Sequence, residues 1–108
     1  MDESPVIRIW VTNKNNRAVT SEMNESLIEF LTSAADNGCN GFTYAEDAER
    51  LIVFTVWSSE EILEEFRTTD VYKNREKEII RNFSLADYQL HEDILFNSTA
   101  KIIDSFSN

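Results

Sequence analysis

The chain has 108 residues, of which 42% are hydrophobic, and a formal net charge of −10 at pH 7. This length and hydrophobic content predict one folded domain over residues 1–108 and argue against a disordered chain. Because phosphate contacts require clustered Lys and Arg, the acidic charge argues against a nucleic-acid partner.

Cysteine usage and the N-terminus indicate the compartment. Cys39 is the only cysteine, so no intrachain disulfide can form, and no residue stands at metal-ligand spacing from it. Residues 1–5 lack the basic and apolar regions of a signal peptide, and no apolar run is long enough to span a bilayer. We therefore expect a cytoplasmic protein with no membrane partner.

The first part of the chain predicts a strand, a helix and a short second strand. Residues 6–11 follow a proline and place apolar side chains on both faces. Ser21 is the expected N-cap of a helix whose apolar residues recur at helical spacing, and Asn37-Gly38 is a typical helix end. Residues 41–44 are the expected second strand, which a turn connects to the next one.

The strand predicted at residues 50–57 is apolar on both faces. One face carries Leu51, Val53, Thr55 and Trp57, and the other carries Ile52, Phe54 and Val56. A strand with one face in water would alternate apolar with polar residues, so both faces of this sheet need a cover. Helices in so short a chain can cover one face. We infer that the same face of a second copy covers the other, in a homodimer.

Two helical segments are predicted after this strand. Ser58 and Glu61 have the spacing of a capping box, which places the first helix start directly after the strand. The sequence at residues 68–70, Thr-Thr-Asp, predicts a break and a second N-cap. Beyond it an apolar stripe continues to Phe83, and Glu76 belongs to that stripe by its spacing.

The C-terminal part predicts one more strand and an extension. Residues 88–96 alternate apolar with polar side chains, interrupted at Glu92, and His91 is expected to face the surface. Residues 97–108 form the extension, with a short helix around residues 100–106. The order βαββαβ predicts an α+β, ferredoxin-like fold, with a four-stranded antiparallel sheet and helices on one face.

One segment resembles a known family. The sequence at residues 52–61, Ile-Val-Phe-Thr-Val-Trp-Ser-Ser-Glu-Glu, followed by Phe66 and by Thr69-Asp70-Val71-Tyr72, resembles the antibiotic biosynthesis monooxygenase domain family. The resemblance implies a dimeric α+β barrel over a core of residues 6–96, with a pocket between the sheet and the broken helix. It also implies a small apolar or aromatic ligand. Because family members that oxidise aromatic polyketides need no metal, flavin or haem, we expect no cofactor.

The implied pocket gives candidate site residues. Trp57 and Phe66 would form apolar walls for a flat ligand, although both residue types more often belong to a core. Tyr72 would donate a hydrogen bond to a ligand oxygen, or would simply anchor its helix to the sheet. Glu76, if buried, would have a raised pKa and could accept a proton; otherwise it reaches solvent at the edge of the stripe. The rest of the expected lining is Ile7, Phe42 and Tyr44.

Two functions remain open at this point. One is a cofactor-independent monooxygenase acting on a small aromatic or polyketide-like molecule, and the other is a non-catalytic ligand-binding or regulatory dimer of the same fold. The haem-degrading branch of the family is disfavoured because Ile7, Phe66 and Glu76 occupy the places of its Asn, Trp and haem-ligating His. No nucleophilic triad, phosphate loop or metal-ligand cluster is visible in the sequence.

Overall fold

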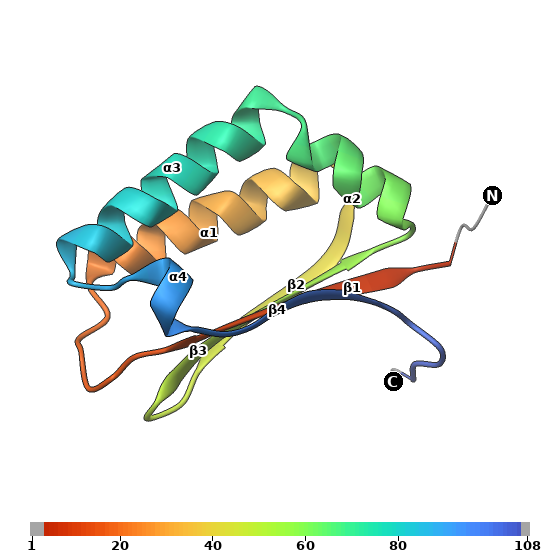
Figure 1. Cartoon of the computed structure of the whole chain (residues 1–108). Helices are drawn as coiled ribbons and strands as arrows, with labels where there is room; N and C mark the ends of the chain where they lie inside the picture. The colour runs from red at the N-terminus through yellow and green to blue at the C-terminus, as the bar shows by residue number, and fades with distance from the viewer. Residues whose placement is uncertain (1–3, 107–108) are drawn as a thin grey trace.

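The computed structural model describes residues 4–106 and shows a four-stranded antiparallel sheet with all helices on one of its faces (Figure 1). The strand order is β2-β3-β1-β4, which confirms the ferredoxin-like prediction. In this part of the chain no helix is long and apolar enough to cross a membrane. The elements in chain order are β1 (Val6–Asn13), α1 (Ser21–Asp36), β2 (Cys39–Glu46), β3 (Arg50–Trp57), α2 (Glu60–Arg67), α3 (Asp70–Leu85), α4 (Leu90–Asp93) and β4 (Ile94–Lys101).

The helix starts lie close to their predicted positions. The break between α2 and α3 is confirmed, because the Thr69 hydroxyl accepts the backbone N–H of Tyr72 in the first turn of α3. The other two N-caps are each one residue away from the prediction: Thr20 rather than Ser21 caps α1, and Ser59 rather than Ser58 caps α2. In both cases the residue that caps the helix, Thr20 or Ser59, has the extended backbone conformation that an N-cap requires.

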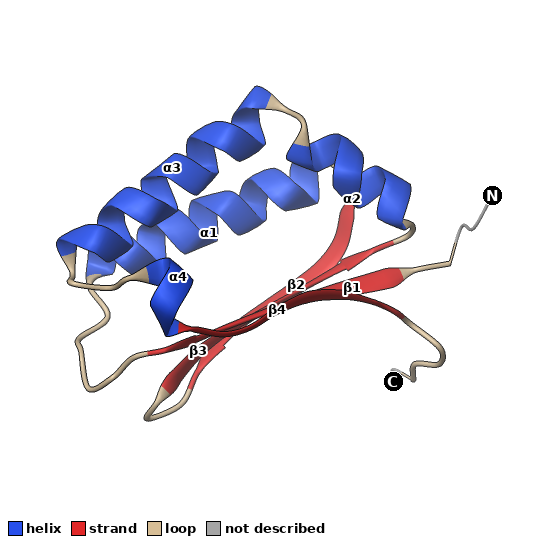
Figure 2. Ribbon diagram, viewed as in Figure 1, coloured by secondary structure: helices blue, strands red, loops and turns tan. Residues whose placement is uncertain are grey.

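Strand β3 has the two faces that its sequence predicts. Its residues Leu51, Val53, Thr55 and Trp57 point toward the helices and are buried, whereas Ile52, Phe54 and Val56 point away and are half-exposed. Adjacent strands continue both faces, because antiparallel partners such as Ile9 and Phe54 share a side of the sheet. We call the side that faces away from the helices the outer face, and no helix of residues 4–106 covers it (Figure 2).

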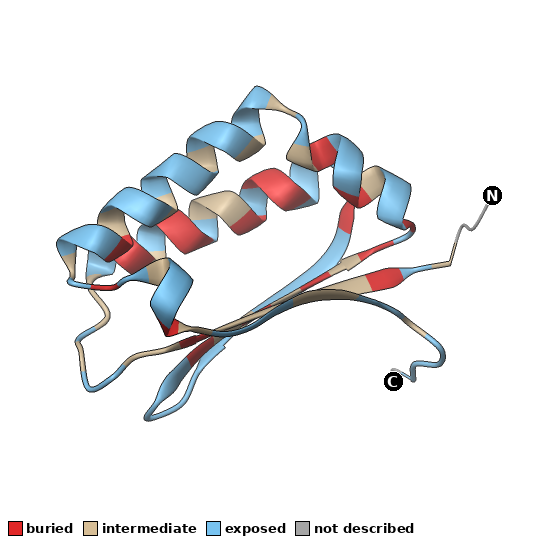
Figure 3. Ribbon diagram, viewed as in Figure 1, coloured by how far each residue is buried: buried red, intermediate tan, exposed pale blue. Residues whose placement is uncertain are grey.

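The core fills the space between the helices and the other side of the sheet, which we call the inner face (Figure 3). Phe83 of α3 is fully buried there, with Trp10 of β1 edge-on at 5.8 Å between ring centroids. Tyr88 packs against the same ring at 5.4 Å. These ring contacts hold α3 over β1 on the inner face of the sheet. The candidate site lies on the same face.

The C-terminal predictions are wrong in two places. Residues 88–96 are not one strand: Tyr88 is buried in the core, and residues 90–93 form the single turn α4. Strand β4 starts only at Ile94 and pairs with β1 through Lys101, so the helix predicted around residues 100–106 does not form. Beyond β4 the chain is irregular up to residue 106, and residues 107–108 of the predicted extension lie outside the described part.

Candidate active site

A cavity of about 340 Å³ lies between the inner face of the sheet and the helices. Its floor comes from β3, β1 and β4, and its walls come from all four helices. Most of its lining is aliphatic and aromatic, with a few polar side chains from several elements. Sites for small molecules usually have this composition, in which apolar walls supply affinity and a few polar groups fix orientation.

The apolar wall is built around Trp57. Its ring stacks on that of Phe66, with ring centroids 5.5 Å apart and an interplanar angle of 28°. The indole N–H donates to the Thr55 hydroxyl at 2.9 Å, which fixes the ring orientation. Phe30 of α1 meets Phe66 edge-on at 5.9 Å. These rings line the cavity from within the core, because Trp57 and Phe66 are only 1% and 2% exposed.

Two of the polar lining residues, Tyr72 and Glu76, lie one turn apart on α3. The Tyr72 hydroxyl donates to the Glu76 carboxylate at 3.0 Å. Burial raises the pKa of the half-buried Tyr72 phenol, and the Glu76 charge raises it further. Tyr72 is therefore a hydrogen-bond donor at neutral pH. Glu76 is exposed at the rim, so it reaches solvent at the edge of the stripe and is not a buried carboxylate.

Two arginines flank these groups. Arg8 of β1 is half-buried, and its guanidinium donates to the Thr99 hydroxyl at 3.0 Å and to the Asn97 side-chain oxygen at 2.7 Å, both on β4. Burial lowers the pKa of Arg8, and the nearby charge of Arg67 lowers it further. Arg67 itself pairs with Glu64 at 3.1 Å.

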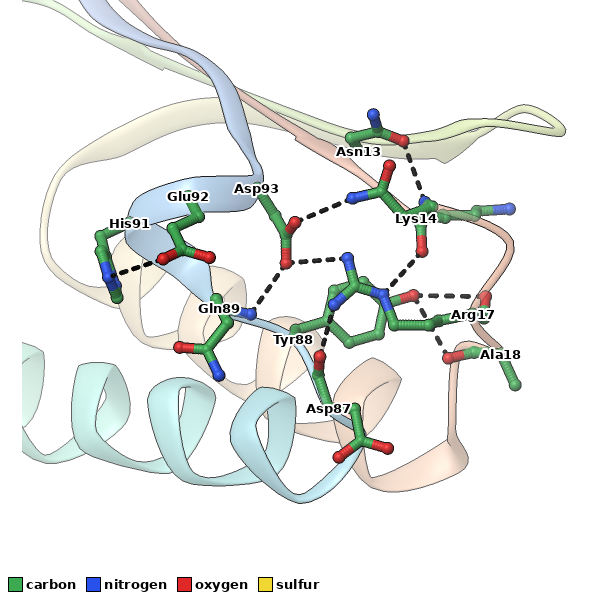
Figure 4. A network of polar contacts seen from close by, with 11 residues as sticks. Asn13, Lys14, Arg17, Ala18, Asp87, Tyr88, Gln89, His91, Glu92 and Asp93 are labelled. Atoms are coloured by element: carbon green, nitrogen blue, oxygen red, sulfur yellow. Dashed lines mark hydrogen bonds and ion pairs between the residues drawn. The ribbon is translucent and has the colours of Figure 1, made fainter.

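A polar network at the other end of the cavity holds α4 in place (Figure 4). Asp93 lies 2.8 Å from the Arg17 guanidinium and accepts the Gln89 backbone N–H at 2.8 Å. The Arg17 guanidinium also lies over the Tyr88 ring, 4.2 Å from its centroid. This network places His91 at the edge of the cavity. His91 was predicted on the last strand, and it lies instead on α4 with its side chain 79% exposed.

Four of the seven predicted site residues line this cavity together: Trp57, Phe66, Tyr72 and Glu76. They come from the end of β3, from α2 and from the first two turns of α3. The strand-to-helix segment with the family resemblance therefore supplies one continuous side of the cavity.

The other three predicted residues do not line the cavity. Ile7 pairs with Val56 on the outer face, because neighbours along a strand point to opposite sides. Phe42 and Tyr44 are on β2, an edge strand next to β3 that contributes no residue to the cavity lining. Tyr44 packs into the core, where its hydroxyl donates to the Asn24 side chain of α1.

Sequence reasoning missed Arg8 and Trp10 as lining residues. Both share the inner face of β1 with Val6, and together with Thr55 they form part of the cavity floor. The available signal was an arginine in the middle of an otherwise apolar strand face. A charged side chain at such a position needs either a partner or a function.

Comparison with known proteins identifies the fold. No protein-family model matches the chain, and no curated protein matches it in sequence. Among solved structures, a candidate antibiotic biosynthesis monooxygenase from Caulobacter crescentus superimposes with a TM-score of 0.70 at 10% identity, covering 94% of this chain and 92% of that one. The chain has the fold of the antibiotic biosynthesis monooxygenases.

Two further structures show the range of proteins with this fold. SnoaB from Streptomyces nogalater, a cofactor-independent oxygenase, matches with a TM-score of 0.64 at 6% identity, covering 98% of this chain and 97% of that one. A hydroxynitrile lyase from Passiflora edulis matches with a TM-score of 0.66 at 12% identity, covering 98% and 100%. The monooxygenase fold therefore occurs in proteins named for more than one chemistry.

Proposed function

We propose that the protein is a cofactor-independent monooxygenase that acts on a small, flat aromatic molecule in the cavity on the inner face. The observation that carries this proposal is the pairing of the Trp57–Phe66 wall with a protonated Tyr72 donor in one cavity of about 340 Å³. The wall would hold the rings of the substrate, and the Tyr72 hydroxyl, which donates to Glu76 in this structure, would turn to donate to the substrate oxygen. The oxygenase SnoaB, which has the same fold, supports this reaction class.

The proposed reaction begins with a proton transfer. An activated CH₂ group between aromatic rings loses a proton to Glu76, which lies at the rim beside Tyr72. Tyr72 stabilises the negative charge that then develops on the conjugated oxygen. The carbanion reduces dioxygen, the two combine to a hydroperoxide, and loss of water leaves a carbonyl. In sum, one CH₂ and one O₂ give one C=O and one H₂O, and the substrate supplies all the electrons.

A non-catalytic ligand-binding dimer remains the second candidate, and the position of Glu76 favours it. A general base is most effective where water is excluded, whereas Glu76 is exposed. In that case the same walls and the same donor would bind a ligand without turning it over.

We also infer that the outer face is covered by a second copy of the chain. Its central residues are Ile7, Ile9, Val11, Ile52, Phe54 and Val56, all half-exposed in a single chain. A contiguous apolar surface of this kind usually marks an interface. Since the cavity lies on the inner face, a dimer formed this way leaves both cavities open to ligand.

Oxygen uptake separates the two candidate functions. With 1,8-dihydroxyanthrone as substrate, a monooxygenase consumes one O₂ per molecule faster than the uncatalysed reaction, and the product has a new carbonyl group. Binding without any uptake above the uncatalysed rate would overturn the monooxygenase proposal and favour the binding dimer.

A further inference from the structure

Arg8 differs from the other arginines in having no acidic partner among the described residues. The remaining five each lie within 4.0 Å of a carboxylate, in the pairs Arg17–Asp93, Arg50–Asp47, Arg67–Glu64, Arg75–Glu29 and Arg81–Glu78. Within residues 4–106, no carboxylate lies that close to Arg8, although the whole chain has a net charge of −10. An arginine kept away from so many available carboxylates suggests a partner from outside the chain.

The position of Arg8 makes this unpaired charge accessible to a ligand. Arg8 lies on the inner face of β1, it lines the cavity, and it is half-buried. Its two terminal nitrogens are held by neutral acceptors of β4, Asn97 at 2.7 Å and Thr99 at 3.0 Å. These contacts orient the planar guanidinium without neutralising it. A guanidinium has five N–H donors, so donors remain for a planar anion.

We propose that the ligand of this cavity carries a carboxylate and that Arg8 binds that carboxylate, which makes the substrate a flat aromatic acid. This inference rests on the proposed function, because it requires that the cavity takes a small ligand. The aromatic part would lie along the Trp57–Phe66 wall while the carboxylate meets Arg8. Arg8 is then a specificity-determining residue for the reaction of this site.

The surrounding charges favour a monoanion over a phosphate. The charged groups that act on Arg8 are Arg67, Glu64 and Glu76, and Arg67 is already paired with Glu64. Arg8 and Arg67 both line the cavity together with Glu76, but only Arg8 has no carboxylate of its own among the described residues. A carboxylate brings one negative charge and matches the planar fork of the arginine, whereas a phosphate dianion would add a second charge next to Glu76.

Calorimetric titration with matched probes tests the inference. The probes are 2-naphthoate and its neutral analogue 2-naphthamide, which share the same two rings. We expect wild-type protein to bind 2-naphthoate at least about tenfold more tightly, as a hydrogen bond to a charged group would give. In Arg8→Gln the two affinities become equal within about twofold, because 2-naphthoate loses more affinity than 2-naphthamide. Arg8→Lys keeps part of the preference, because it keeps the charge and loses the fork.

Arg81→Gln is the matched control. It makes the same charge change on the exposed side of α3, where Arg81 lies 3.9 Å from Glu78, so it should keep the full preference for 2-naphthoate. The wild-type ratio and Arg8→Lys test the inference even if Arg8→Gln fails to fold.

Three results would overturn the inference alone: equal binding of both probes by wild type, an undiminished preference in Arg8→Gln, or tighter binding of 2-naphthyl phosphate than of 2-naphthoate. Failure of both aromatic probes to bind wild type would instead contradict the proposed function, and the inference with it.

Discussion

The indole N–H of Trp57 donates to the hydroxyl of Thr55, two residues earlier on the same face of β3, at 2.9 Å. Thr12, on the inner face of neighbouring β1, is also buried, but its hydroxyl has no hydrogen-bond partner within the described residues. The same substitution should therefore have opposite effects at the two threonines. A buried hydroxyl without a partner costs free energy, whereas one that satisfies an indole N–H does not.

Thr12→Val should raise the free energy of unfolding by about 1 kcal/mol, and Thr55→Val should lower it by about 1–3 kcal/mol. Valine has nearly the same shape as threonine and suits a strand, so the hydroxyl is the main difference. Chemical denaturation of both variants measures the two changes. Destabilisation of similar size at both positions would show that the Thr12 hydroxyl is satisfied in solution.

Tyr72→Phe should lower kcat/KM for oxygen uptake about tenfold, because it removes the donor to the developing oxyanion. Tyr44→Phe is the matched control, since the Tyr44 hydroxyl bonds to Asn24 of α1 and lies outside the cavity. Rates from an oxygen electrode measure both effects. Equal loss in the two variants would point to a change in stability rather than to the site.

Glu76→Gln should lower kcat about a hundredfold with little change in substrate affinity, because it removes the proposed proton acceptor and keeps the shape of the side chain. Single-turnover rates and calorimetric affinities separate the two quantities. Unchanged kcat would remove Glu76 from the mechanism.

Asp93→Asn should lower the free energy of unfolding by about 2 kcal/mol at pH 7, because Asp93 bonds to Arg17, to Asn15 and to the Gln89 backbone. Burial opposes ionisation of Asp93, but these donors outweigh it and lower its pKa. A lowered pKa stabilises the fold above the pKa of the unfolded chain, and this contribution disappears as the pH falls through the folded value.

The difference between wild type and Asp93→Asn should therefore shrink below about pH 4. Thermal unfolding from pH 7 to pH 2 follows this change, with Asp104→Asn as a control at an exposed carboxylate. A difference that stays constant over the whole range would contradict the role given to the ionised carboxylate.

The dimer proposal concerns the outer face, where Phe54 and Ile9 are paired across β3 and β1. Light scattering should give twice the 12.5 kDa mass of one chain. Phe54→Lys should give the mass of a single chain, because it places a charge at the centre of the apolar face. Val71→Lys adds the same charge on α3, where Val71 is 42% exposed, and should leave the dimer intact. A single-chain mass for wild-type protein would contradict the proposal.

Most of the fold could be predicted because its signals are local. In the eight residues of β3, alternate side chains point to opposite faces, so the sequence predicts which residues each face carries. The break before α3 is predicted by Thr69, whose hydroxyl caps that helix. Four cavity residues followed from the same continuous segment. The C-terminal error has a different origin, since Tyr88 contacts Ala18 and Asp93 pairs with Arg17, both at least 70 positions earlier. No local pattern contains that information.

The site predictions failed where they depended on strand order and register. Ile7 and Arg8 are adjacent in sequence, but only Arg8 faces the cavity, because β1 pairs with β3 in the register that places Arg8 opposite Thr55. Phe42 and Tyr44 do not line the cavity because β2 is the edge strand beside β3, whereas β1 and β4, on the other side of β3, complete the cavity floor. Neither the order nor the register can be derived from the composition of one strand.

Amide correlation NMR spectra recorded during titration with 2-naphthoate show most directly whether the cavity takes a flat aromatic ligand. We predict shifts concentrated at Trp57, Phe66 and Tyr72, with the indole N–H signals of Trp57 and Trp10 among the largest, and small shifts at Ile9 and Phe54 on the outer face. Absence of shifts at millimolar ligand, or shifts concentrated on the outer face, would contradict the assignment of the site.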